Sequence, residues 1–347
     1  MTSVSSALQI SIVIPNYNGA AYLEKCLSSI LRQARAAKEI LVVDNASTDD
    51  SVLVVQRVAP TARILRQQHN LGFAGAANAG IRHAQGDWIA ILNNDTEVAG
   101  AWLGECAAAI ERHPDTAFLA CRILDYKKRH LVFSAGDCIL RAGIGYRRGQ
   151  ELPDCSRYDE EIEVFSACGG AALYRKSALE ESEGFEELFF AYLEDVDLGL
   201  RLQAAGHCGY YAPLAVVYHH GAATSGGEFS PLAVRLRTRN SVLLLVKSMP
   251  GRVLWRCLPM ILAAQASWFV RTMLRGRGLS YLRGIMDAFP MLPEMLKRRT
   301  RLRLYWRSSV SRLWQSILRS EALAREDFLG ASGDKISLFL KWYFKLF

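Results

Sequence analysis

Two groups of carboxylates in this sequence have the composition and position needed for chemistry on a charged ligand. An apolar run at 88–92 ends abruptly in Asn93, Asn94 and Asp95, and an aromatic stretch at 185–193 leads directly into an acidic cluster at 194–197. Carboxylate and amide oxygens suit a divalent cation, and a carboxylate beside a hydroxyl can act as a general base. The first group also fits an ordinary Asn/Asp turn that closes a strand, so its surroundings must decide between the two.

An alternation of strands and helices is expected to carry both groups. Short runs rich in Ile, Val and Leu predict strands, and apolar residues at helical spacing follow the early ones. The predicted strands are 8–15, 40–43, 63–65 and 88–92, and the intervening helices are 20–33, one ending at Val58, and one opened by 69–81. This order predicts an α/β fold with a doubly wound, mainly parallel sheet that binds ligands at the carboxyl ends of its strands.

Two of these strand ends place a carboxylate on the same rim, Asp44 and Asp95. Asp44 can accept a hydrogen bond from a base or ribose, while the loop with Gly72 and Gly75 leaves backbone amides free for a phosphate at a helix start. The chain has no Gly-x-Gly-x-x-Gly after its first strand and no Gly-Lys-Ser/Thr, so a dinucleotide fold and a P-loop are excluded. A nucleoside diphosphate with a metal is the better interpretation.

Five ordered segments carry a resemblance to a known family. The chain resembles, in their order and spacing, the inverting family 2 glycosyltransferases of the GT-A fold, and within them the rhamnosyltransferase-like branch. The resemblance covers residues 9–221. The segments are IVIPNYN (12–18), VVDNASTD (42–49), NLGFAG (70–75), NND (93–95) and LEDVD (193–197).

The resemblance implies a nucleotide-sugar site in which Asp44 faces the imide edge of uracil or thymine. It also implies a divalent cation, Mn²⁺ or Mg²⁺, with Asp95, Glu97 and His219 as ligands. The sequence departs from the family's Asp-x-Asp motif because Asn93 and Asn94 replace carboxylates, and Glu97 is the candidate for the missing oxygen. The implied nucleotide-sugar-binding residues are Pro15, Tyr17, Asn18, Asp44, Asn45, Asn70, Gly72, Asn78, Asn94 and Asp95.

By its place in the last motif, Asp195 is implied to be the catalytic base that takes a proton from the acceptor hydroxyl. A glycine-broken hairpin is expected over 132–148, covering the acceptor side, and a strand over 165–173 with a glycine pair inside it. Such a pair indicates either a close ligand or a bulge. The residues expected on the acceptor or sugar side are Trp102, Gly169, Gly170, Glu194 and Asp197, although helix capping explains Asp197 equally well.

The charge of the chain is divided sharply along its length. Residues 1–234 hold 20 Lys and Arg against 28 Asp and Glu, a net of −8, whereas 235–347 hold 22 against 6, a net of +16. We therefore expect a glycosyltransferase domain over 1–234 and a helical, basic, membrane-associating region over 235–347. The eight cysteines are scattered without a Cys-x-x-Cys pair, and no apolar signal segment follows Met1, which together indicate free thiols and a reducing cytosol.

The basic region is expected to lie on an anionic membrane and not to cross it. Its longest apolar run, 254–270, is interrupted by Arg256, Pro259 and Gln265. Basic clusters interleaved with aromatic and aliphatic residues are typical of interfacial helices, and these apolar faces favour lipid over nucleic acid as the partner. The expected location is the cytoplasmic side of the cell membrane, with an oligomer left open.

The expected function is transfer of a sugar from a nucleoside-diphosphate donor, dTDP-rhamnose first and a UDP-sugar second, to a lipid-linked saccharide in surface polysaccharide synthesis. The rhamnose preference follows from the resemblance alone. Two alternatives remain open. One is a nucleotidyltransferase of related fold, although the loop at 15–19 has no Lys or Arg to hold a triphosphate. The other is a non-catalytic membrane-bound scaffold of the same fold.

Overall fold

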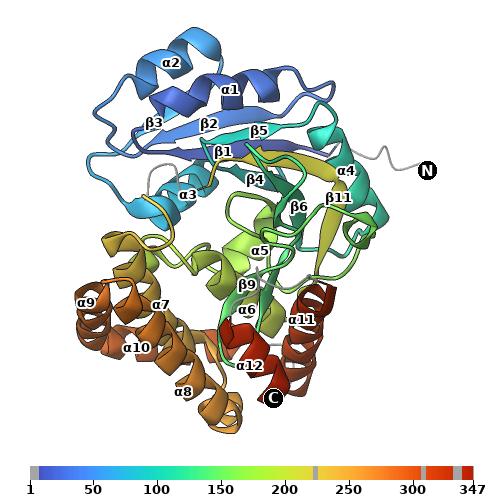
Figure 1. Ribbon diagram of the computed structural model, residues 1–347. Coiled ribbons are helices and arrows are strands. Elements are labelled where there is room, and N and C mark those ends of the chain that lie inside the picture. Colours follow the sequence, from blue (N-terminus) through green and yellow to red (C-terminus); the bar gives the residue numbers. More distant parts are fainter. Residues whose placement is uncertain (1–7, 222–225, 306–309, 331–337, 347) are drawn as a thin grey trace.

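A computed structural model describes residues 8–221, 226–305, 310–330 and 338–346. One large sheet forms the centre of the molecule, and its strand order is β3-β2-β1-β4-β10-β6-β11-β5, with β7 paired to β6. Helices cover both faces of the sheet, and six further helices after β11 pack below it in the view of Figure 1.

The first four strands of the sheet are parallel, as predicted. They are β1 (Ile10–Asn16), β2 (Glu39–Asp44), β3 (Arg63–Arg66) and β4 (Trp88–Leu92). Helices α1 (Ala20–Leu31) and α2 (Ser51–Val58) cover one face, and α3 (Gly72–His83) covers the other (Figure 1). The register pairs Asn16 with Asp44, so β1 and β2 end side by side on the predicted rim.

The remaining strands make the sheet mixed. β10 lies antiparallel between β4 and β6, β11 runs parallel to β6, and β5 pairs antiparallel with β11 at the edge. This order brings the end of β11 beside the segment that follows β4. The elements are β5 (Thr96–Val98), α4 (Trp102–Arg112), β6 (Phe118–Asp125), β7 (Val132–Ser134), β10 (Ala171–Arg175), α5 (Lys176–Glu181), α6 (Glu194–Ala205) and β11 (Gly209–His219), with 3₁₀ turns at Ser156–Tyr158 and Glu187–Phe189.

Two predicted elements differ from the structure. The expected strand over 165–173 begins only at Ala171, because the glycine pair before it forms a turn whose backbone approaches other side chains. The expected hairpin over 132–148 is divided: β7 joins the main sheet, and a separate hairpin forms from β8 (Asp137–Ile139) and β9 (Gly145–Arg147). The chain turns between these two strands at Gly143, which has a φ of 71° that favours glycine.

The C-terminal helices are joined to the sheet-containing part of the chain and do not form a separate tail. The predicted boundary after Val234 lies inside α7, whose Leu243 and Leu244 share a buried cluster with Val196 and Leu200 of α6. The described residues of this region form six helices, with a 3₁₀ turn at Phe289–Met291: α7 (Pro231–Ser248), α8 (Gly251–Leu274), α9 (Gly278–Ala288), α10 (Leu292–Tyr305), α11 (Val310–Gly330) and α12 (Leu338–Leu346).

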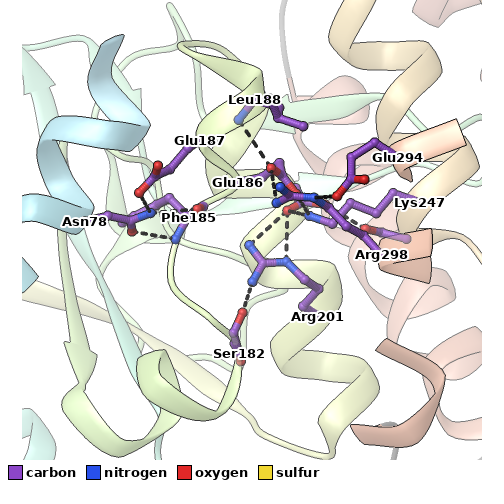
Figure 2. A network of polar contacts seen from close by, with 12 residues as sticks. Asn78, Ser182, Phe185, Glu186, Glu187, Leu188, Arg201, Lys247, Glu294 and Arg298 are labelled. Atoms are coloured by element: carbon purple, nitrogen blue, oxygen red, sulfur yellow. Dashed lines mark hydrogen bonds and ion pairs between the residues drawn. The ribbon is translucent and has the colours of Figure 1, made fainter. Parts of the chain in front are cut away.

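Buried ion pairs reinforce this junction. Figure 2 shows Lys247 of α7 and Arg298 of α10 meeting at Glu186, with Nζ–Oε2 and Nη1–Oε1 distances of 2.9 and 2.7 Å. On the other side, α11 holds the β8–β9 hairpin, because Glu321 accepts from the Arg141 backbone at 2.7 Å and Asp327 accepts from the Tyr146 hydroxyl of β9 at 3.3 Å. Charges in the basic region therefore serve partly to dock it.

Helix α8 is the helix of the described chain that is long and apolar enough to cross a membrane by length and composition. Only 22% of its apolar window is buried. Its exposed apolar residues follow helical spacing, and α9 has a second exposed set. These residues are Trp255, Leu258, Leu262, Phe269 and Met273 on α8 and Leu279, Leu282 and Met286 on α9.

Candidate active site

The end of β11 and the segment after β4 bring Asp95 and His219 together. The His219 Nε2 atom lies 3.0 Å from Asp95 Oδ1 and 3.3 Å from Asn93 Nδ2. Both side chains are buried, and His219 Nδ1 has no hydrogen-bond partner. Burial would raise the pKa of Asp95, but the adjacent His219 imidazole holds it below its usual value. An oxygen and an imidazole nitrogen at this spacing fit a divalent cation.

A buried carboxylate at the end of β2 faces the predicted nucleoside position. Asp44 is 6% exposed, and its Oδ1 atom has no partner in the structure. A buried carboxylate oxygen without a donor is costly, so an N–H from a bound base would stabilise it. Pro15 is half-buried and Tyr17 is 39% exposed on the neighbouring strand end. Asn94 is anchored next to them, because its Nδ2 donates to Asn16 Oδ1 at 2.7 Å.

The predicted asparagines of this rim hold its loops in shape. Asn45 Nδ2 donates to Asn70 Oδ1 at 2.9 Å, and the same Asn70 oxygen accepts from the Gly72 amide at 2.8 Å. Gly72 has a positive φ of 72°, and a Cβ there would lie 2.4 Å from the Phe190 carbonyl oxygen, so both the backbone and the available space favour glycine. Asn18 Oδ1 accepts from the Thr48 amide at 2.8 Å. These bonds fix the backbone that frames the nucleotide position.

Asp195 lies at the start of α6 with its carboxylate held by two backbone amides. Oδ1 accepts from the Val196 amide at 2.8 Å and Oδ2 from the Gly169 amide at 3.1 Å. Burial raises the pKa of Asp195 despite these bonds. The adjacent Glu194 is also buried, its Oε2 has no partner, and burial together with the Asp195 charge raises its pKa well above the usual range.

The glycine pair before β10 joins the two chemical groups. The Gly169 amide binds Asp195, and a Cβ on Gly170 would lie 3.1 Å from both Cε1 and Nδ1 of His219. The Gly170 carbonyl accepts from the Asn93 amide at 3.0 Å. Two adjacent residues thus contact the predicted base on one side and the predicted cation ligand on the other. A Cβ on Gly169 would lie 3.1 Å from the Phe73 ring, so space is tight at both positions, which favours glycine at each.

Asp137, Cys168 and Arg147 were not predicted as residues of this site. One ligand atom from each of Asp137, Cys168 and Asp195 lies within 4.8 Å of the others. Burial and the Asp195 charge raise the pKa of Asp137 to about 8. The Arg147 guanidinium lies 4.4 Å from the Phe133 ring, which packs edge-on against His219. Asp137 and Arg147 belong to the β8–β9 hairpin, which has no motif that marks it.

A small cavity of about 100 Å³ opens beside Asp95. The ring of His220 forms one wall and stacks on Tyr126 at 3.7 Å between centroids. Lys25 donates to the Tyr126 hydroxyl at 3.1 Å and lines the same cavity. His220 is therefore packed between aromatic side chains next to the Asp95–His219 pair.

Two residues predicted in the site lie in the protein interior. The prediction that Trp102 contacts the acceptor is wrong, because α4 packs it against the sheet with 0% exposure and its indole N–H donates to Cys121 Sγ at 3.3 Å. Asn78 points away from the nucleotide position. Its amide donates to the Phe185 carbonyl and accepts from the Phe185 amide, both at 2.8 Å (Figure 2).

Two predicted carboxylates have other partners. Asp197 is fully buried away from the acceptor side and is bound by Arg201 at 2.9 Å, Lys247 at 2.7 Å and Ser248 at 2.6 Å. Burial would raise the pKa of Asp197, but the two cations lower it to about 2. Glu97 pairs with Arg129 at 3.1 Å and lies opposite Tyr218 in the β5–β11 register, so this geometry does not supply it as a cation ligand.

Comparison with known proteins gives one family and one fold. Residues 11–182 match the family model for Glycosyl transferase family 2. The chain is 28% identical over 244 residues to the N-acetylglucosaminyl-diphospho-decaprenol L-rhamnosyltransferase of Mycobacterium tuberculosis, a match that covers 63% of this chain and 78% of that protein.

Solved structures share the architecture. The first 349 residues of TarS from S. aureus align with a TM-score of 0.54 at 16% identity, over 92% of each chain. GalNAc-T7, solved with UDP, GalNAc and Mn²⁺, aligns with a TM-score of 0.58 at 15% identity, over 71% of this chain and 49% of that chain. These likenesses confirm the predicted GT-A fold.

Proposed function

We propose that this chain, a member of glycosyl transferase family 2, transfers a sugar from a nucleoside-diphosphate donor to an acceptor hydroxyl with inversion. The observation that carries the proposal is the meeting of Asp195 with the Asp95–His219 pair across the Gly169–Gly170 turn. An inverting transfer needs one base on the acceptor side and a charged group at the leaving diphosphate. Asp195 and the Asp95–His219 pair are proposed to fill these two roles, and the unpartnered Asp44 oxygen supports a nucleoside position at the end of β2.

The chemistry assigned to Asp195 is proton abstraction from the acceptor hydroxyl. As its carboxylate takes the proton, the hydroxyl oxygen forms a bond to the anomeric carbon and the bond to the diphosphate breaks, which inverts that carbon. Two backbone amides fix the orientation of the carboxylate, and burial raises its pKa, which makes it a stronger base than an exposed aspartate. The protonated Asp137 beside it adds no second charge at neutral pH.

Asp95 and His219 are the residues proposed to hold a divalent cation, Mn²⁺ or Mg²⁺. The buried His219 Nε2 atom and the Asp95 carboxylate, whose nearer oxygen lies 3.0 Å from it, would fit such an ion. When bound, the cation would offset the charge of the donor diphosphate. GalNAc-T7, which shares the fold, was solved with Mn²⁺ and UDP.

The proposed donor is dTDP-rhamnose, with a UDP-sugar second, and the proposed acceptor is a lipid-linked saccharide. The Mycobacterium tuberculosis relative transfers L-rhamnose to N-acetylglucosaminyl-diphospho-decaprenol, as its name states. Asp44 can accept from the imide N–H that thymine and uracil share, so its geometry supports both nucleotides equally.

A glycan transfer assay tests this function. The full chain with Mn²⁺ is incubated with a synthetic lipid-diphosphate saccharide and either dTDP-rhamnose or a panel of UDP-sugars, and product is followed by mass spectrometry. We expect transfer from one donor, and Asp195→Asn should lower turnover by about 10²- to 10⁴-fold while nucleoside diphosphate binding persists. Near-normal turnover in that variant would remove Asp195 as the base.

The proposed location is the cytoplasmic face of the membrane, with α8 and α9 lying in the bilayer interface. Their exposed apolar stripes are accompanied by exposed Arg252, Arg256, Arg275 and Arg283. Each arginine near an anionic leaflet contributes about 1 kcal/mol, and the attraction weakens as salt screens it. A lipid-linked acceptor would be presented at this surface.

Vesicle flotation tests the membrane proposal. The full chain should float with vesicles of phosphatidylglycerol and phosphatidylcholine, float less in high salt, and stay unbound with phosphatidylcholine alone. Leu262→Glu on the α8 stripe should weaken flotation, whereas Leu214→Glu on β11 is a matched control, since both side chains are 60% exposed. Equal loss in the two variants would argue against docking through α8.

A further inference from the structure

The segment that leads into Asp195 has an unusual backbone. Three residues, Phe190, Tyr192 and Leu193, have backbone φ values of 64°, 73° and 67°, a range that residues other than glycine rarely adopt. Leu193 is also the N-cap of α6 and makes no side-chain capping bond. A run of such residues persists only where surrounding contacts hold it. The direction of the Asp195 side chain therefore depends on what holds residues 188–193.

Most of that support comes from helix α7. Asn240 Nδ2 donates to the carbonyl oxygens of Phe189, Ala191 and Tyr192 at 3.0, 2.9 and 2.7 Å. The neighbouring Arg239 Nη2 donates to the carbonyls of Leu188 and Phe189 at 3.0 and 2.8 Å. Asn240 has 0% exposure, so water cannot replace these bonds.

The two remaining carbonyls of the segment are bound from the catalytic half. The Phe190 carbonyl accepts from the Ala74 amide of α3 at 3.1 Å, and the Leu193 carbonyl accepts from the Asp197 amide within α6 at 2.9 Å. The segment thus connects the donor-side loop at Gly72 with the base, and α7 supports it from the other side. One of the carbonyls that Asn240 binds, that of Tyr192, lies only three residues before Asp195 in the chain.

We propose that Asn240 is a positioning residue, which aims Asp195 at the acceptor hydroxyl by holding the left-handed segment 190–193 through three carbonyl oxygens. The catalytic consequence of this inference rests on the proposed function. The hydrogen bonds by which Asn240 holds the segment do not depend on that function. The side chain that α7 uses for this purpose lies outside residues 11–182, which match the family model. The C-terminal region thereby contributes to the reaction centre as well as to membrane docking.

The experiment compares Asn240→Asp with Thr238→Val in the full chain. Asn240→Asp keeps the size of the side chain and removes its donors. Thr238, also 0% exposed on α7, accepts from Trp268 Nε1 at 2.9 Å, so this side-chain hydrogen bond joins α7 to α8 and not to the segment. Hydrogen exchange at residues 190–196 should rise at least about tenfold in Asn240→Asp and stay unchanged in Thr238→Val. Turnover should fall by about 10- to 100-fold only in the first variant, with the Kd for the nucleoside diphosphate within about threefold.

Each outcome decides the proposal. Unchanged exchange at 190–196 in Asn240→Asp would overturn the positioning role whatever the activity, and equal loss of turnover in both variants would reduce Asn240 to a structural residue. If Asn240→Asp does not fold, Asn240→Ser retains one donor and should give an intermediate rise in exchange. A wild-type chain that transfers no sugar would contradict the proposed function alone, because the exchange comparison still tests the segment.

Discussion

Asp137 is expected to make the stability of this protein depend on pH, and Asp137→Asn should remove that dependence. Burial first, and the charge of Asp195 second, raise the pKa of Asp137 to about 8, from about 3.9 in an unfolded chain. At pH 7 the folded protein therefore keeps most of this side chain protonated. An asparagine has the same shape and no charge, and its oxygen can still accept from the Ser134 hydroxyl, which lies 2.8 Å from Asp137 Oδ1.

The sign follows from proton binding. The folded pKa is raised, so the stabilisation is fully present below about pH 4 and is lost as pH rises through about 8. Within that window the wild type loses about 1.4 kcal/mol of unfolding free energy per pH unit from this group, or roughly 3 kcal/mol between pH 5 and 7. The free energy of unfolding of Asp137→Asn, relative to that of the wild type, should therefore rise by roughly 3 kcal/mol between pH 5 and 7.

Chemical unfolding of both proteins at pH 5, 6 and 7 measures this difference. Asp287→Asn is the control, because its Arg235 ion pair lowers the pKa of Asp287, and the window lies above both its folded and unfolded values. Its effect should be constant from pH 5 to 7. A difference between Asp137→Asn and wild type that does not change with pH would show that Asp137 is ionised in the folded protein.

Two further predictions concern the proposed cation ligands and the buried Trp102. Asp95→Ala and His219→Ala should each weaken Mn²⁺-dependent binding of the nucleoside diphosphate by calorimetry, and His220→Ala should weaken it much less, since its ring packs against Tyr126. Equal effects at the two histidines would contradict the assigned ligand. Trp102→Ala should lower the free energy of unfolding by about 3–5 kcal/mol, as expected for a buried tryptophan. If Trp102→Ala instead raised only the KM for the acceptor and left stability unchanged, the prediction that Trp102 contacts the acceptor would be supported after all.

The sequence predicted the parallel half of the sheet because its signals are local. Each apolar run in residues 10–92 ends in turn-forming polar residues, and a strand and its end can both be identified from such a pattern. The resemblance to a family supplied Asp195 and His219 as site residues. Asp137 and Arg147 were missed because a hairpin stabilised by α11 brings them to Asp195, and no local pattern encodes that distant contact.

The errors have a common physical origin. Trp102 follows the acidic motif closely, and an aromatic residue at that position has the same sequence signal whether it packs in a core or against a sugar. Lys247, Arg298 and Arg299 counted toward a lipid-facing charge, yet all three bind groups within the protein, with Arg299 donating to the Val246 and Met249 carbonyls. Net charge gives no information on which cations have buried partners.

The antiparallel placement of β10 between β4 and β6 sets the order in which strands can pair while the ribosome makes the chain. Strands β1 to β3 pair only within the group β1–β4, and β4 can pair with β1 once Leu92 has left the exit tunnel. The other edge of β4, and the edge of β6 that faces it, have no partner until Ala171–Arg175 has been made. The nucleoside rim can therefore form during translation well before Asp195 and His219 emerge. In pulse-labelled nascent chains, we expect the backbone amides of β1 and β2 to be the first that are protected from hydrogen exchange. Until β10 is made, the unpaired edge of β4 is the surface that a chaperone would cover.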